Sequence, residues 1–175
     1  MDPGSLYNDI YEKDITLSIG KYLEKYLSEM GATVIMTRTS DSDLSNGARN
    51  HRKKADFDER IKIINQKIVD MYLSIHLNYL TDTRYYGAQV FYNKNNEELA
   101  KSIQEYLNNN TNTNREVKKI PTSTYMYDKL NTNGVLVECG FLSNPEELKA
   151  LQDDGYQKKA VQCILDGIES YLADI

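Results

Sequence analysis

The chain has 175 residues, a formal net charge of −5 and a pI near 5.1, which argues against a nucleic-acid binder because such proteins normally carry a basic face. Its length suits one domain that can bury most of its apolar surface without covalent cross-links. Only two cysteines are present, Cys139 and Cys163, so a disulfide framework and a CxxC metal site are both excluded. No apolar stretch approaches membrane-spanning length, and no secretory signal is visible.

Helix-like and strand-like patterns alternate along the chain. We expect, in chain order, a helix at 12–30, a strand at 32–37, a polar loop at 40–56, a helix at about 57–68, strands at 71–77 and 87–92, a helix at 97–107, a strand at 134–141, a helix beginning near 145 and a final helix at 156–172. Repeated helix-to-strand steps are typical of a parallel sheet with covering helices. The predicted fold is therefore a single α/β domain over residues 1–175, with a mostly parallel twisted sheet and helices on both faces.

Two of the predicted strands end in ionisable residues. The run from Leu73 to Asn78 contains apolar residues and presents His76, and the run from Gly134 to Phe141 presents Glu138 in the same way. Open α/β sheets carry their functional sites at strand ends. A lone histidine there is ordinarily a satisfied imidazole at the edge of a core, but two such strands predict one shared cleft.

Several short motifs occur in a characteristic order. They are Glu12-Lys13-Asp14 at a helix start, Thr37-Arg38 after a strand, Arg60 and Asn65 in a helix, Ser74-Ile75-His76-Leu77-Asn78, and the run from Val137 to Asn144. This ordered set resembles the zinc-dependent N-acetylmuramoyl-L-alanine amidases, a family that cleaves bacterial cell-wall peptidoglycan, and it covers essentially the whole chain. The long polar loop and residues 7–13 are most similar to the germination-specific branch of spore formers.

The resemblance implies a catalytic Zn²⁺ site, which needs about three nitrogen or oxygen ligands and one open position for water. It makes Glu12 and His76 two of the ligands and Glu138 the carboxylate that works on the attacking water. The implied substrate is the amide between the lactyl group of N-acetylmuramic acid and L-alanine, with Asn78 and Arg38 as the expected substrate-binding residues. Without the motifs, Glu12 would be an ordinary helix N-terminal charge, and Glu138 would be half of a buried salt bridge with an arginine.

The chain departs from the family at its N-terminus. Family members begin the domain with a strand and an Asp-Pro-Gly-His-Gly-Gly type turn whose histidine is the third zinc ligand. Here Asp2-Pro3-Gly4-Ser5 fits better as the second acidic-glycine turn that follows it. The third ligand, a histidine, is therefore expected upstream of Met1, on a strand beside the His76 strand, so that the domain as given lacks its first strand and first ligand turn. The other histidine, His51, lies in a basic loop that disfavours a neighbouring dication.

Two other function classes stay open at this point. A cysteine hydrolase would use Cys139 as nucleophile and His76 as base, although Cys139 directly follows Glu138 in a strand and should point to the opposite face. A non-catalytic peptidoglycan binder or regulatory pseudoenzyme is the other class, because the missing ligand weakens the case for catalysis. The resemblance implies a peptidoglycan partner and an extracytoplasmic location in the cell wall or spore envelope, while an accessory protein is not specified by the sequence.

Overall fold

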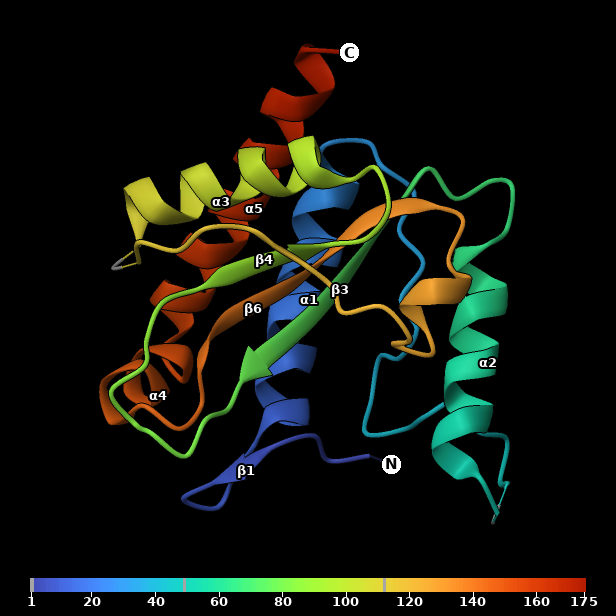
Figure 1. Ribbon diagram of the computed structural model, residues 1–175, viewed down its shortest axis with the longest axis horizontal. Coiled ribbons are helices and arrows are strands. Elements are labelled where there is room, and N and C mark those ends of the chain that lie inside the picture. Colours follow the sequence, from blue (N-terminus) through green and yellow to red (C-terminus); the bar gives the residue numbers. More distant parts are fainter. Residues whose placement is uncertain (1, 49, 112) are drawn as a thin grey trace.

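Helices and strands alternate along most of the computed structural model, which describes residues 2–48, 50–111 and 113–175 (Figure 1). Met1, Arg49 and Asn112 lie outside the described residues, and Arg49 belongs to the polar loop predicted at 40–56. The strands are β1 (Leu6–Tyr7), β2 (Ile10–Tyr11), β3 (Met71–Asn78), β4 (Gln89–Tyr92), β5 (Lys118–Lys119) and β6 (Asn133–Phe141). The helices are α1 (Glu12–Glu29), α2 (Arg52–Ile64), α3 (Glu97–Asn110), α4 (Pro145–Leu151) and α5 (Asp154–Ala173), with a 3-10 turn η1 (Tyr127–Lys129). Among these described residues, no helix combines the length and the apolarity of a bilayer-spanning segment.

The main sheet is mixed. Its order is β3-β6-β4-β5, with β3 parallel to β6, β4 antiparallel to β6, and β5 parallel to β4. The connection from β3 to β4 contains no helix, so the chain re-enters the sheet at the same end of the strands at which it left. β4 must therefore run antiparallel to β3 and β6. The predicted α/β fold is confirmed, and β4 and β5 both run opposite to β3 and β6.

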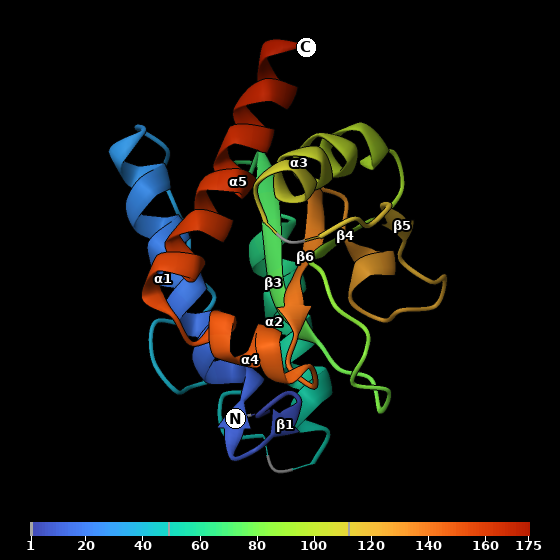
Figure 2. The ribbon, with the colours of Figure 1, turned by 90° about the vertical axis from the view of Figure 1, so that its left-hand side faces the viewer.

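The side chains of β3 alternate between two apolar layers, one on each face of the sheet. The odd-numbered apolar residues of β3 pack in the larger layer with α1, α3 and α5, whereas Tyr72 packs in a smaller layer with Phe57 of α2. Figure 2 shows α1 and α5 together on one side of β3 and β6. His76 has the same parity as Tyr72, and the register pairs His76 with Glu138, so both ionisable residues face the α2 side.

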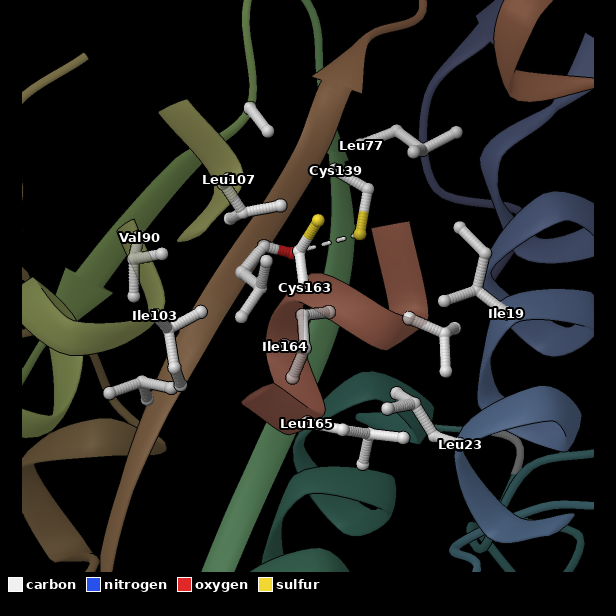
Figure 3. Close-up of a cluster of buried hydrophobic side chains, with 14 of the residues drawn as sticks. Ile19, Leu23, Leu77, Val90, Ile103, Leu107, Cys139, Cys163, Ile164 and Leu165 are labelled. Carbon is white, nitrogen blue, oxygen red and sulfur yellow. Dashed lines mark hydrogen bonds between the residues drawn. The ribbon is translucent and has the colours of Figure 1, made fainter. Parts of the chain in front are cut away.

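The larger layer is the main hydrophobic core, and α5 runs through its centre (Figure 3). Ile19 of α1, Ile103 of α3 and Ile164 of α5 have no exposed surface. Gly167 permits close contact between α3 and α5, because a Cβ at this position would lie 2.5 Å from the Cα of Ile103. These helices cover most of one face of the sheet, and the candidate site lies on the other face.

The strand predicted at 32–37 is wrong, because this segment makes no strand pairing in the structure. A strand needs a neighbour that satisfies its backbone N–H and C=O groups. β3 is the edge of the sheet, and β6 is its sole sheet neighbour in the described chain. Ile35 is accordingly 49% exposed. The segment keeps a strand-like composition and lacks a partner.

Two helix boundaries also differ from the prediction. α2 begins at Arg52, inside the predicted polar loop, and ends at Ile64 rather than Ile68. Its first turn is held by ion pairs, with Arg52 bound to Asp43 and Lys54 to Asp58 at 2.6 Å. The basic residues Arg52, Lys53 and Lys54 therefore form the first turn of a helix rather than part of a loop, and the two lysines stay exposed.

Truncating a buried core residue tests the larger layer. Ile19→Ala should lower the free energy of unfolding by about 2–5 kcal/mol, because the lost methylene groups forfeit transfer energy and leave a cavity. Ile68→Ala is the matched control, since Ile68 is 77% exposed, and it should change stability by less than about 0.5 kcal/mol. Urea denaturation followed by circular dichroism measures both variants, and equal losses would contradict this assignment of the core.

Candidate active site

The candidate site lies where the C-terminal ends of β3 and β6 meet the start of α1. The hairpin of β1 and β2 leads directly into Glu12, the first residue of α1. It turns at Asn8 and Asp9, whose φ angles of 48° and 62° match the left-handed values of a type I′ hairpin. The backbone N–H of Glu12 donates to the carbonyl of Ser5 at 2.9 Å. The hairpin thereby fixes the helix start, and with it the Glu12 carboxylate, beside β3.

Glu12 and His76 form a direct pair. Glu12 Oε1 lies 3.0 Å from His76 Nδ1 and accepts the N–H of Leu77 at 3.2 Å, while Oε2 accepts the N–H of Ser5 at 2.8 Å. Burial alone would raise the pKa of Glu12, but these bonds outweigh it and hold the pKa below its ordinary range. Burial alone would lower the pKa of His76, but the bond to Glu12 together with the charges of Glu138 and Glu12 outweighs it, so that pKa is raised. The two side chains are therefore fixed with their charge-bearing atoms facing each other.

Glu138 faces this pair from β6. Its Oε2 is buried and has no hydrogen-bond partner among the described residues. Burial raises the pKa of Glu138 to about 7, opposed by His76 and assisted by Glu12. No arginine among the described residues forms the salt bridge to Glu138 that the sequence left open, and Arg60, which lines the same cleft, donates from Nε to Asp56 at 2.8 Å. A buried carboxyl that titrates near neutrality can both accept and return a proton.

A cleft of about 690 Å³ opens beside these three residues. It runs between α1, the segment 35–38, β3 and the loop 124–127, and the predicted substrate residue Arg38 lines it. The Arg38 guanidinium donates to the carbonyl of Lys13 and to Thr16 Oγ1, so it ties the unpaired segment to α1. A substrate role for Arg38 stays a prediction.

Asn78 lies at the end of β3, just beyond a bulge. His76 pairs with Glu138, but Asn78 pairs with Phe141, so β6 contains one more residue than β3 over this interval. The carbonyl of Asn78 accepts the N–H of Leu142 at 2.8 Å. Asn78 does not line the cleft that the described residues form, and its role in substrate binding also stays a prediction.

Sequence reasoning missed a polar group deeper in the cleft. The hydroxyl oxygens of Ser74 and Tyr127 are 2.9 Å apart, and burial raises the pKa of Tyr127. Tyr72 lies beside them, with a buried hydroxyl that has no partner among the described residues. The alternation of β3 places Tyr72 and Ser74 on the face of His76, and that signal was available in the sequence. Nothing in the sequence pattern brings Tyr127 to this position.

Cys139 lies on the opposite face of the sheet. It is 1% exposed, sits in the core among the side chains of Figure 3, and its Sγ lies 3.9 Å from the carbonyl oxygen of Val137. Burial raises the pKa of its thiol, which disfavours a nucleophilic thiolate. The structure therefore does not support a cysteine hydrolase that uses Cys139 on a substrate in the cleft.

The residues at the site fit a zinc ion in part. Imidazole nitrogen and carboxylate oxygen are zinc ligands, and bonds of about 2.0 Å in a tetrahedral arrangement place two such ligands roughly 3.3 Å apart. The separation of 3.0 Å between Glu12 Oε1 and His76 Nδ1 is close to that spacing. The described part of the chain contains no group of three or more His, Cys, Asp or Glu residues that could hold a metal. A complete zinc site therefore requires a further ligand.

These features define a single α/β domain with a candidate metal site where β3 and β6 end beside the start of α1. The N-acetylmuramoyl-L-alanine amidase family matches residues 1–170. The germination-specific N-acetylmuramoyl-L-alanine amidase of Bacillus subtilis is 40% identical over 180 aligned positions, which cover 99% of this chain and 76% of that protein.

Two solved structures agree with this assignment. The CwlD amidase of Clostridioides difficile, solved in complex with the GerS lipoprotein, has a TM-score of 0.92 and 39% identity and covers 100% of this chain and 94% of its own. The AmiC2 amidase of Nostoc punctiforme has a TM-score of 0.83 and 26% identity, with 98% and 91% covered. The chain belongs to the N-acetylmuramoyl-L-alanine amidase family and is an amide hydrolase.

The Glu12 carboxylate also stabilises the fold around the site. Glu12→Ala should lower the free energy of unfolding by about 1–3 kcal/mol, because the N–H groups of Ser5 and Leu77 lose their acceptor. Asp14→Ala is the control on the same helix, since the Asp14 side chain is 62% exposed, and it should change stability by less than about 0.5 kcal/mol. Urea denaturation in the presence of a chelator isolates this effect from metal binding. Equal stability of wild type and Glu12→Ala would show that these bonds contribute nothing net.

Proposed function

We propose that the protein is a zinc-dependent amidase that hydrolyses the bond between the lactyl group of N-acetylmuramic acid and L-alanine in peptidoglycan. The proposal depends on one observation above all: the buried Oε2 of Glu138 lies opposite the Glu12–His76 pair and has no hydrogen-bond partner in the described part of the chain. Family membership supports the substrate. The germination-specific relative supports an extracytoplasmic role in the cell wall or spore envelope, and the GerS complex of the CwlD amidase supports an accessory protein as a partner.

Glu138 carries the proton transfers in this mechanism. Glu12 and His76 would hold the zinc ion, which when bound would polarise the scissile carbonyl and acidify the attacking water. Glu138 Oε2 accepts one proton from that water as its oxygen adds to the carbonyl carbon. Glu138 then returns the proton to the amide nitrogen as the C–N bond breaks, which releases the amine of L-alanine and the lactyl carboxylic acid, whose remaining proton passes to solvent. A pKa of about 7 suits both directions of transfer.

The third zinc ligand would come from outside these 175 residues. We propose that it is a histidine upstream of Met1, on a strand that lies between β3 and the segment 32–37. In the described chain, the outer edge of β3 has no strand partner, and neither has the segment 32–37. Ile35 and Met36 from one flank and Leu73 and Ile75 from the other line the same cleft, as expected for a position that accepts a strand. On this proposal, residues 1–175 are an amidase domain without its first strand and first ligand turn.

A zinc titration tests the missing ligand. The chain as given should bind zinc weakly, and a chain extended by its upstream coding sequence should bind stoichiometrically and more than about 100-fold tighter, because two protein ligands hold a metal far less well than three. Isothermal titration calorimetry measures both. Backbone amides at 32–36 should gain protection from hydrogen exchange only in the extended chain. Tight, stoichiometric binding by the unextended chain would refute the proposal and direct attention to His51 or a partner protein.

Substituting Glu138 tests the proton transfers. In the zinc-loaded, extended chain, Glu138→Gln should lower kcat on a muramoyl-peptide by about 10²–10⁴-fold, because general acid–base catalysis contributes on that scale, while zinc content stays unchanged. Cys139→Ala is the neighbouring control and should retain turnover, since its thiol lies in the core. Turnover of Glu138→Gln above about a tenth of wild type would remove Glu138 from the mechanism.

A non-catalytic peptidoglycan binder is the second candidate. It is favoured by the two protein ligands, Glu12 and His76, that the chain itself supplies. Such a protein would sediment with peptidoglycan sacculi and release no amino groups from them, even when extended and loaded with zinc. Release of new L-alanine amino groups by the extended chain would exclude it.

A further inference from the structure

Glu147 carries a largely buried carboxylate that the proposed mechanism does not use. It lies in the first turn of α4, where the helix N-terminus favours a negative charge. Burial raises its pKa, and two backbone N–H groups, those of Phe141 and Gly87, partly offset this. The carboxylate therefore faces backbone N–H groups from two different segments, and such groups reduce the cost of burying its charge.

The first of these segments is the bulge in β6. Glu147 Oε2 accepts the N–H of Phe141 at 2.8 Å. Phe141 is the residue at which pairing with β3 resumes after the extra residue that follows Glu138. Gly140, inside the bulge, has a φ of 152°, and a Cβ there would lie 3.3 Å from Glu147 Oε1. Bulges beside active sites re-aim the preceding side chains, so the bond to Phe141 fixes the bulge that sets the direction of Glu138.

The second segment is the loop that joins β3 to β4. The N–H of Gly87, near the end of this loop, faces the Glu147 carboxylate and helps to lower its pKa. Two neighbours of Glu147 hold the rest of the loop, since Ser143 Oγ accepts the N–H of Leu80 at 3.1 Å and Asn144 Nδ2 donates to the carbonyl of Thr83 at 2.9 Å. The loop continues directly from the end of β3. The β6–α4 turn therefore holds the loop that follows His76 and Asn78.

We propose that Glu147 is a positioning residue for amide hydrolysis, whose carboxylate clamps the β6 bulge behind Glu138 to the loop that follows His76. The proposal rests on the proposed function, because it assigns Glu138 to the reaction. The clamp connects the two strands beyond the point where their regular ladder ends. It thereby ties the bulge that follows Glu138 on β6 to the segment that leads from β3 into β4.

A carboxylate is the group that this clamp requires. Both of its partners are N–H donors, so both oxygens must be able to accept. Glutamine has the same shape but offers one carbonyl oxygen and one NH₂ group, and that NH₂ would face an N–H donor. Glu147→Gln therefore removes one of the two bonds without removing volume, which separates the clamp from simple packing.

Hydrogen exchange tests the clamp without requiring activity. In Glu147→Gln, the amide of Phe141 or of Gly87 should exchange at least about fivefold faster than in wild type, the scale set by the loss of one hydrogen bond. Glu146→Gln is the matched control, because Glu146 is exposed in the same helical turn, and it should leave both amides unchanged. The amide of the buried core residue Ile164 reports global unfolding, so local acceleration at Phe141 or Gly87 is the change in excess of that at Ile164. Unchanged exchange at Phe141 and Gly87 would overturn the clamp.

Steady-state kinetics on the zinc-loaded, extended chain test its consequence. Glu147→Gln should lower kcat by about 10- to 100-fold, the usual effect of removing a group that orients a catalytic residue. KM and zinc affinity should stay within about threefold of wild type. Unchanged kcat together with accelerated exchange would overturn the positioning role. An inactive wild type would instead overturn the proposed function, and with it the catalytic part of this proposal, whereas the exchange measurement would still decide the clamp.

Discussion

The parallel register between β3 and β6 is the constraint on which the site depends. It sets His76 opposite Glu138, and both side chains emerge on the face that the main core leaves open. Strand side chains alternate, so a slip of one residue would send Glu138 into the core and bring Cys139 to the cleft. A carboxylate among the apolar side chains of α1, α3 and α5 would be very unfavourable. The core on one face therefore selects the register that the chemistry on the other face requires.

The site combines groups that are satisfied with groups that are not. Glu12 accepts three hydrogen bonds or close polar contacts, and these keep it ionised and in place. Glu138 Oε2 and the Tyr72 hydroxyl lie in the same cleft without partners in the described chain. Unsatisfied buried groups cost free energy and persist where the surrounding structure enforces them, which is common at functional sites. Glu138 Oε2 is thus the oxygen of this site that we expect to exchange protons.

Long periodic segments of the sequence predicted most of the fold. Local apolar periodicity predicts the start of α1 at Glu12 and the strands β3 and β6. The proline and acids after Asn144 mark α4, and the Asn144 side chain accepts hydrogen bonds from the first N–H groups of that helix. The strand expected at 32–37 failed because pairing is not local, and no neighbour is available in this chain. The direction of β4 depends on its connection, which periodicity does not report.

The site was predictable to a similar degree. His76 and Glu138 could be placed together because each ends a strand of the same sheet. The position of Glu12 beside them depends on the β1–β2 hairpin. Each strand of this hairpin has two residues, which is too short for a hydrophobic periodicity to be recognised in the sequence. Tyr127 and Glu147 act through contacts between segments distant in sequence, and no local pattern marks such residues.

The unpaired outer edge of β3 has a consequence for the behaviour of these 175 residues in solution. An edge strand presents a row of free backbone donors and acceptors, and natural proteins usually protect it with charge, proline or a covering segment. β3 carries none of these between Met71 and Leu77, and the exposed Ile35 lies across the cleft from it. Such an edge is a template for intermolecular β-augmentation. Without a covering strand, the isolated chain should associate in a concentration-dependent manner, edge to edge, at the position where its chemistry takes place.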